Sequence, residues 1–86
     1  MSIVFTERFR RVYAKLPPDI RKKVKKALRL LDASPRHPSL RVHQVQGTNG
    51  IYEARVDRKY RMTFTFTGEE RIMRNVDNHD ECLKNP

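Results

Sequence analysis

The fold can be read from residues 50–66, GIYEARVDRKYRMTFTF, because apolar and polar side chains alternate there on both sides of a charged tripeptide. A period of two is typical of strands that bury one face and leave the other open. This stretch therefore predicts two antiparallel strands joined by a tight turn. The side chains of the buried face are then Tyr52, Ala54, Val56, Tyr60, Met62, Phe64 and Phe66.

The turn of this hairpin leaves two registers open. A loop of residues 57–59 sets Arg55 directly opposite Arg61. Like charges in that position destabilise a sheet, but two guanidinium groups together can bind a phosphate. A loop of residues 58–60 would instead pair Asp57 with Arg61 as an ordinary ion pair. The first register is the one we expect.

Three further strands are predicted outside this hairpin, at residues 3–5, 39–43 and 71–77. In the second of them, Leu40 and Val42 alternate with polar residues and fit the buried face. In the last, Ile72 and Val76 fit the buried face, although the same parity also places Arg74 there. We have no explanation from the sequence for an arginine at that position.

Two helices are predicted between the first and second strands. The hydroxyl of Thr6 can cap a helix over residues 7–15, which the pair Pro17-Pro18 ends. A longer amphipathic helix follows and stops before the Pro-rich segment 34–38. Its polar face carries Lys22, Lys25, Lys26 and Arg29.

The order of these elements predicts one α+β domain over residues 1–86. The short connections favour an antiparallel, twisted sheet with the helical hairpin packed on one face. The opposite face of the sheet is then open and concave, because sheets of this kind coil. By parity it presents Arg41, His43, Glu53, Arg55, Arg61, Thr63 and Thr65.

The charge of the chain is uneven. The net charge is +9, and residues 7–29 alone contribute +8 of it. A solvated helix face would explain part of this excess, but the concentration favours an anionic partner such as nucleic acid or an acidic protein. The sequence shows neither a membrane span nor a signal peptide, and a single cysteine, Cys82, allows no internal disulfide, so we expect a cytoplasmic protein.

His79 is the candidate for acid–base chemistry, because imidazole can accept or donate a proton near neutral pH. Asp80 or Glu81 could orient its ring, and the alternative is that His79 merely caps a strand or a short helix. The spacing of the histidines and acids matches no known metal site, so no metal and no cofactor are expected.

Taken together, these patterns resemble the RelE/ParE superfamily of type II toxins. The resemblance covers nearly the whole chain and rests on the basic helical hairpin, residues 50–64 and the tail VDNHDECL at 76–83. It implies the RelE-like fold and a ribosome-dependent mRNA endoribonuclease that works without a metal. In such enzymes the ribose 2′-hydroxyl attacks the adjacent phosphate and leaves a 2′,3′-cyclic product.

The resemblance also implies roles for individual residues. Arg61 matches the catalytic arginine of the family, Arg55 a basic position on the preceding strand, and His79 the C-terminal histidine of one branch. Either Glu53 or His43 could be the general base, and Asp80 could orient His79. The expected partners are a cognate antitoxin, mRNA in the ribosomal A site and rRNA. The residues expected to contact RNA are Arg41, His43, Arg58, Lys59, Lys22, Lys25, Lys26 and Arg29.

The chain departs from the family pattern at two points. Residues 33–52 contain no acid, although one branch of the family has a glutamate base there, and Leu83 replaces the C-terminal aromatic that stacks on a base. Two alternatives therefore stay open. One is a ParE-like inhibitor that binds DNA gyrase, and the other is an inactive relative that only binds antitoxin or nucleic acid.

Overall fold

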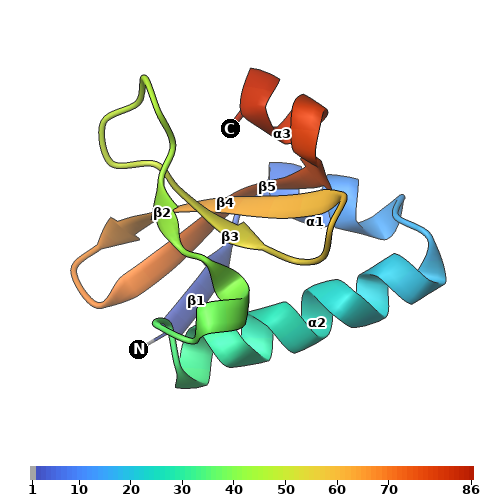
Figure 1. Cartoon of the computed structure of the whole chain (residues 1–86), viewed down its shortest axis with the longest axis horizontal. Coiled ribbons are helices and arrows are strands. Elements are labelled where there is room, and N and C mark those ends of the chain that lie inside the picture. The colour runs from blue at the N-terminus through green and yellow to red at the C-terminus, as the bar shows by residue number, and fades with distance from the viewer. Residues whose placement is uncertain (1) are drawn as a thin grey trace.

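The computed structural model describes residues 2–86 and contains one five-stranded sheet, which lies between helices (Figure 1). Across the sheet the strands lie in the order β1-β5-β4-β3-β2. No helix among the described residues is both long enough and apolar enough to cross a membrane. Along the chain the elements are β1 (Ser2–Phe5), α1 (Glu7–Ala14), α2 (Pro18–Ala33), the 3₁₀ turn η1 (Pro38–Leu40), β2 (His43–Gln44), β3 (Tyr52–Arg55), β4 (Tyr60–Thr67), β5 (Glu70–Asn78) and α3 (His79–Lys84).

The α+β class and the order of the elements are confirmed, but the sheet is mixed rather than wholly antiparallel. β1 pairs with β5 in parallel, whereas the pairs from β2 to β5 are antiparallel. The helical hairpin carries the chain from β1 to the far edge of the sheet, where β2 begins (Figure 1). The meander then returns to the first edge and brings β5 alongside β1.

Both predicted helices form where the sequence placed them. The Thr6 hydroxyl accepts a hydrogen bond from the Phe9 N–H at 3.1 Å, which caps α1. The same hydroxyl donates to the Met73 carbonyl at 2.8 Å and so fixes α1 to β5. Helix α2 starts at Pro18, where a missing N–H costs nothing, and buries Ile20 and Val24 in the core.

The predicted strand over residues 39–43 is largely wrong. Pro38 to Leu40 form a 3₁₀ turn, with the His37 ring accepting from the Ser39 N–H at 3.2 Å. Arg41 then has a φ of 47°, a left-handed conformation that no strand tolerates. Leu40 is nevertheless buried, as expected, but it reaches the core from the turn. Only the short edge strand β2 remains.

The arginine at position 74 is explained by a β-bulge. The pairing of β4 with β5 shifts there, so that Arg74 is an extra residue without a partner. Such an insertion changes the parity of the strand. Met73 and Val76 therefore share the helix-side core, while Ile72 lies on the opposite face, and the predicted pairing of Ile72 with Val76 in the core is wrong.

The register of the central hairpin is the expected one, with Arg55 directly opposite Arg61. Its loop is held by the Asp57 carboxylate, which accepts from the N–H groups of Lys59 and Tyr60 at 2.9 and 2.8 Å. Lys23 of α2 adds an ion pair at 3.1 Å. Burial raises the pKa of Asp57, but these hydrogen bonds and the Lys23 charge outweigh it and hold the pKa below its ordinary value.

The face of the sheet away from α2 is less open than expected. Helix α3 crosses it and packs against β4 and β5 (Figure 1). Thr63 and Asn75, which point to this face, are consequently buried. The part of this face that stays accessible lies beside α3, along β2 and the start of β3.

Candidate active site

A cavity of about 610 Å³ lies between β2, its following loop, β3 and α3. It brings together three residues that the sequence placed far apart along the chain: His43, Glu53 and His79. Leu83, which stands where the resemblance implies an aromatic side chain, completes one wall. The cavity therefore joins two imidazoles, a carboxylate and an apolar surface.

Glu53 lies at the base of this group and is only 2% exposed. Its Oε1 is 3.5 Å from His43 Nε2 and 3.6 Å from Arg61 Nε. Its Oε2 is buried and has no hydrogen-bond partner among the described residues. β3 lies between β2 and β4, so Glu53 is held between an imidazole on one neighbouring strand and a guanidinium on the other.

The orientation of the His43 ring follows from its other nitrogen. Nδ1 lies 2.7 Å from the Arg41 carbonyl oxygen, and because a carbonyl can only accept, Nδ1 carries the hydrogen. In the neutral ring this leaves the lone pair on Nε2, which faces Glu53. The side chain is 59% exposed, so Nε2 can be reached from the cavity.

The two opposed arginines share a carbonyl oxygen. Arg61 Nη1 donates to the Asp57 carbonyl at 2.5 Å and to the Tyr60 carbonyl at 3.0 Å. Arg55 Nε donates to the same Asp57 carbonyl at 3.3 Å. This oxygen and the Glu53 carboxylate offset the repulsion that the register would otherwise create. Arg55 also lines a second cavity toward α2, which His79 does not line.

His79 is the first residue of α3, and the helix cap fixes its backbone. The Asn78 side chain accepts from the Glu81 N–H at 3.0 Å, and the His79 N–H donates to the Lys59 carbonyl at 2.6 Å. The ring itself is 45% exposed, and its Nδ1 is 3.7 Å from the Asp80 carboxylate. That distance is longer than a hydrogen bond, so Asp80 does not hold the ring by one.

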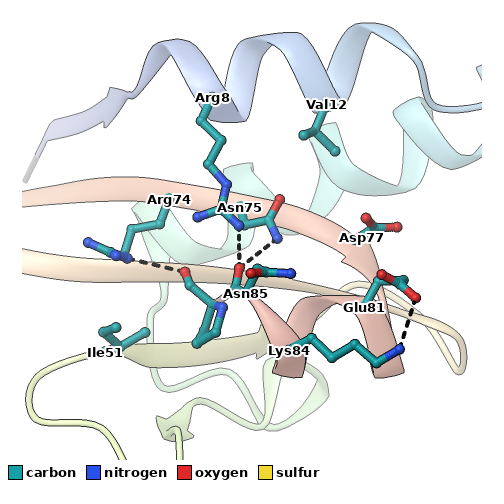
Figure 2. A pocket seen from close by; sticks show the side chains of 10 residues that line it. Arg8, Val12, Ile51, Arg74, Asn75, Asp77, Glu81, Lys84 and Asn85 are labelled. Carbon is teal, nitrogen blue, oxygen red and sulfur yellow. Dashed lines mark hydrogen bonds and ion pairs between the residues drawn. The ribbon is translucent and has the colours of Figure 1, made fainter.

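The end of the chain anchors α3 through contacts that the sequence did not predict. Asn85 and Pro86 lie against β4 and β5, and Figure 2 shows Arg8 of α1 and Arg74 and Asn75 of β5 directed toward them. In the sequence, the only indication of these contacts was Arg74, which did not fit the predicted parity of its strand. The β-bulge directs its side chain toward Pro86. The Asn85 carbonyl accepts from Arg8 and, at 2.9 Å, from Asn75; the Pro86 carbonyl accepts from Thr63 at 3.0 Å and Arg74 at 3.1 Å.

Cys82 lies beneath the site and is fully buried. Its thiol donates to the Arg61 carbonyl at 3.6 Å. Burial, followed by the nearby Glu53 carboxylate, raises the pKa of the thiol to about 12. Cys82 is therefore a packing residue and not a nucleophile at neutral pH.

The residues expected to contact RNA are divided between the two sides of the molecule. Arg58 and Lys59 are exposed and share a shallow depression with His79. Arg41 is exposed but lines a different cavity. The four basic residues of α2 are also exposed, but α2 covers the face of the sheet opposite α3 (Figure 1), so the structure does not bring them to His79.

Comparison with known proteins identifies the fold. No protein-family model matches the sequence, and no curated protein matches it. Among solved structures, the chain is similar to RelE from the RelB–RelE antitoxin–toxin complex of Methanococcus jannaschii, with 21% identity, 96% of this chain and 99% of that chain covered, and a TM-score of 0.75. YafQ of Escherichia coli is 17% identical, with 93% of this chain and 94% of that chain covered and a TM-score of 0.75. YoeB of Staphylococcus aureus is 15% identical, with 92% of this chain and 97% of that chain covered and a TM-score of 0.74. The protein thus has the RelE-like toxin fold that the resemblance implied.

Proposed function

We propose that this chain is the toxin of a type II toxin–antitoxin system and cleaves mRNA on the ribosome, without a metal. The observation that carries the proposal is the cavity that joins His43, Glu53 and His79 next to Arg61. Cleavage by the ribose 2′-hydroxyl needs a base, an acid and positive charge at the phosphate. On a RelE-like toxin fold, the cavity supplies two imidazoles for the base and the acid, and Arg61, behind Glu53, supplies the positive charge.

His43 fits the role of base better than Glu53. The His43 side chain is 59% exposed and lines the cavity, whereas the Glu53 carboxylate is almost fully buried. In the proposed step, His43 Nε2 takes the proton of the 2′-hydroxyl, and the 2′-oxygen forms a bond to phosphorus. The bond from phosphorus to the 5′-oxygen breaks, and His79 donates a proton to that oxygen. The products are a 2′,3′-cyclic phosphate and a 5′-hydroxyl.

In this proposal Glu53 and Arg61 stabilise the charges that develop during the reaction. The carboxylate stabilises the imidazolium that forms on His43, because it lies 3.5 Å from Nε2. Two nitrogens of Arg61 are engaged with Glu53 and with backbone carbonyls, which leaves Nη2 for a phosphate oxygen. Arg55 adds positive charge from the adjacent strand, and Asp80 acts on His79 only through its field.

The proposed partners are RNA and an antitoxin protein. Arg58 and Lys59 are exposed beside His79, which supports a role for both in contacting the RNA backbone. Leu83 offers a nucleobase an apolar contact without ring stacking. One structural relative, RelE, was solved as a complex with the antitoxin RelB, which supports an antitoxin partner for this chain. A cytoplasmic location is part of this proposal.

The test is primer extension on an mRNA translated in a purified system, with and without the protein. Because general acid or base catalysis contributes about 10²–10⁴-fold, His79→Ala and His43→Ala should each reduce cleavage by at least about 100-fold. The third histidine, His37, immediately precedes η1 and lines a different cavity, so His37→Ala is the matched control and should cleave normally. Dependence of cleavage on pH should be bell-shaped.

Two results would contradict the proposal. Cleavage that persists in both His79→Ala and His43→Ala would remove the chemistry from this cavity. Intact mRNA together with inhibition of DNA gyrase by the wild-type protein would favour the ParE-like alternative instead.

A further inference from the structure

A second feature of the structure lies far from His79: a buried arginine with no hydrogen-bond partner for two of its nitrogens within residues 2–86. Arg71 is 1% exposed, and its Nε and Nη1 have no hydrogen-bond partner among the described residues. Its guanidinium lies over the Phe66 ring, 5.6 Å from the centroid. An aromatic ring offsets only part of the cost of burying a guanidinium, which ordinarily needs a carboxylate or phosphate.

Arg71 lines a cavity of about 520 Å³ that opens to the surface. Its other walls are the 35–38 turn, Val42, Tyr52 and Phe66, and exposed Arg36 and Arg41 contribute two more positive charges. No aspartate or glutamate is among the residues that line it. The cavity therefore combines a desolvated guanidinium, further cations and apolar walls, which together suit an anion attached to an apolar group.

The arrangement of the aromatic rings favours a peptide over a nucleobase. Tyr52 stacks on Phe64 and meets the edge of Phe66, and one face of Phe66 is occupied by Arg71. A nucleobase needs a free ring face to stack on. A branched apolar side chain needs only a depression, and Phe66, 45% exposed, offers one beside the charge.

This cavity is separate from the candidate active site. Phe66 and Arg71 face the helix side of the sheet, whereas Glu53 and Arg61 face the side of α3. Phe66 is five residues from Arg61 along β4, a distance of about 16 Å. A ligand bound at Arg71 would leave the His79 cavity accessible.

We propose that this cavity binds an acidic segment of a partner protein. The segment places a carboxylate on Arg71 and an adjacent apolar side chain against Phe66 and Tyr52. Arg36 and Arg41 attract it from the rim. The inference does not depend on RNA cleavage, because binding can be measured on the purified chain in the absence of ribosomes.

The test uses a blocked, fluorescein-labelled pentapeptide with two glutamates around a leucine, measured by fluorescence anisotropy. Versions with both glutamates changed to glutamine, or with the leucine changed to glycine, should bind at least tenfold more weakly. Arg71→Met should weaken binding of the acidic peptide at least tenfold. The rim variant Arg36→Gln with Arg41→Asn should weaken it about threefold, since asparagine tolerates the left-handed backbone at position 41.

A matched control removes the same charge elsewhere. Lys22→Gln with Arg29→Gln lies on the exposed face of α2 and should leave peptide binding unchanged. Equal weakening by this control would reduce the effect to net charge and overturn the proposal. So would unchanged binding by Arg71→Met, or a hexauridylate that binds more tightly than the peptide and depends on Arg71.

The thermal midpoint of Arg71→Met separates ligand binding from a purely structural role. If Arg71 stabilised the fold, its removal would lower the midpoint. Removing an unpaired buried charge leaves an apolar side chain well placed, so Arg71→Met should melt at the same temperature as wild type or higher. Failure of this variant to fold would mean that Arg71 has partners within the fold, and would also overturn the proposal. Arg71→Lys, which cannot bind a carboxylate bidentately, should fold and bind more weakly.

Discussion

The environment of Glu53 depends on the side chains of the two neighbouring strands. Glu53 was expected on an open surface, but it is buried between His43 and Arg61. Parity correctly predicted the face and the register of the hairpin. It could not predict the burial, because alternation within a strand carries no information on whether α3 and residues 85–86 cover the same face.

At the residue scale, Asp57 should make the stability of the protein dependent on pH. Its pKa is lowered in the folded state, so its contribution is present above the unfolded value of 3.8 and is lost as the pH falls through the folded value. Asp57→Asn should therefore lower the free energy of unfolding at pH 7 by about 1 kcal/mol, a small value because the group is partly exposed. Urea unfolding at pH 7 and pH 2 measures the difference.

The lysine that pairs with Asp57 provides the control. Lys23→Gln removes the ion pair but leaves both backbone hydrogen bonds to the carboxylate, so it should cost less than half as much. At pH 2 the stabilities of wild type and Asp57→Asn should converge. A difference that stays constant between pH 7 and pH 2 would show that the carboxylate charge has no part in holding the loop.

Whole elements were predicted where a local signal exists and missed where position depends on distant parts of the chain. The proline and cap signals correctly bounded α1 and α2. The strand at 39–43 failed, because Pro38 and the left-handed Arg41 impose a turn that outweighs the apolar alternation. The bulge at Arg74 reversed the faces of half of β5, and no pattern in a single strand reports an inserted residue.

At the element scale, α3 should depend on its cap. It has six residues, too few to be stable alone, and Asn78 satisfies the Glu81 N–H at its start. Loss of a cap costs about 1 kcal/mol, which for this helix means local fraying around His79. Asn78→Ala should therefore lower the cleavage rate by up to about fivefold, with a shift in the thermal midpoint of no more than a few degrees.

The conservative variant separates capping from other causes. Asn78→Asp keeps an acceptor oxygen at the helix start and should retain most of the cleavage activity. Equal losses in Asn78→Asp and Asn78→Ala would mean that Asn78 acts in some way other than as a cap. Primer extension and a thermal melt on the same protein samples provide both readouts.

At the scale of the whole molecule, the basic helix α2 and the proposed chemistry lie on different sides of the sheet. Residues 7–29 contribute +8 of the net charge of +9, and they form the two helices of the hairpin. The proposed cleavage cavity lies on the side of α3 (Figure 1). A large anion such as the ribosome could contact both sides at once, and α2 would then contribute affinity without taking part in the reaction.

The α2 surface should therefore affect binding and not the rate of cleavage. Changing Lys22, Lys25, Lys26 and Arg29 to glutamine should weaken ribosome binding and reduce the slope of log affinity against log salt by about 3, while the cleavage rate at saturating ribosomes stays the same. Anisotropy of the labelled protein between 50 and 200 mM salt, roughly the range over which phosphate contacts lose most affinity, measures the slope. Changing three exposed cations of the first helix and its C-cap, Arg10, Arg11 and Lys15, tests whether the effect belongs to α2. An unchanged slope in the α2 variant would mean that these charges are only solvated and that the ribosome is bound through the α3 side alone.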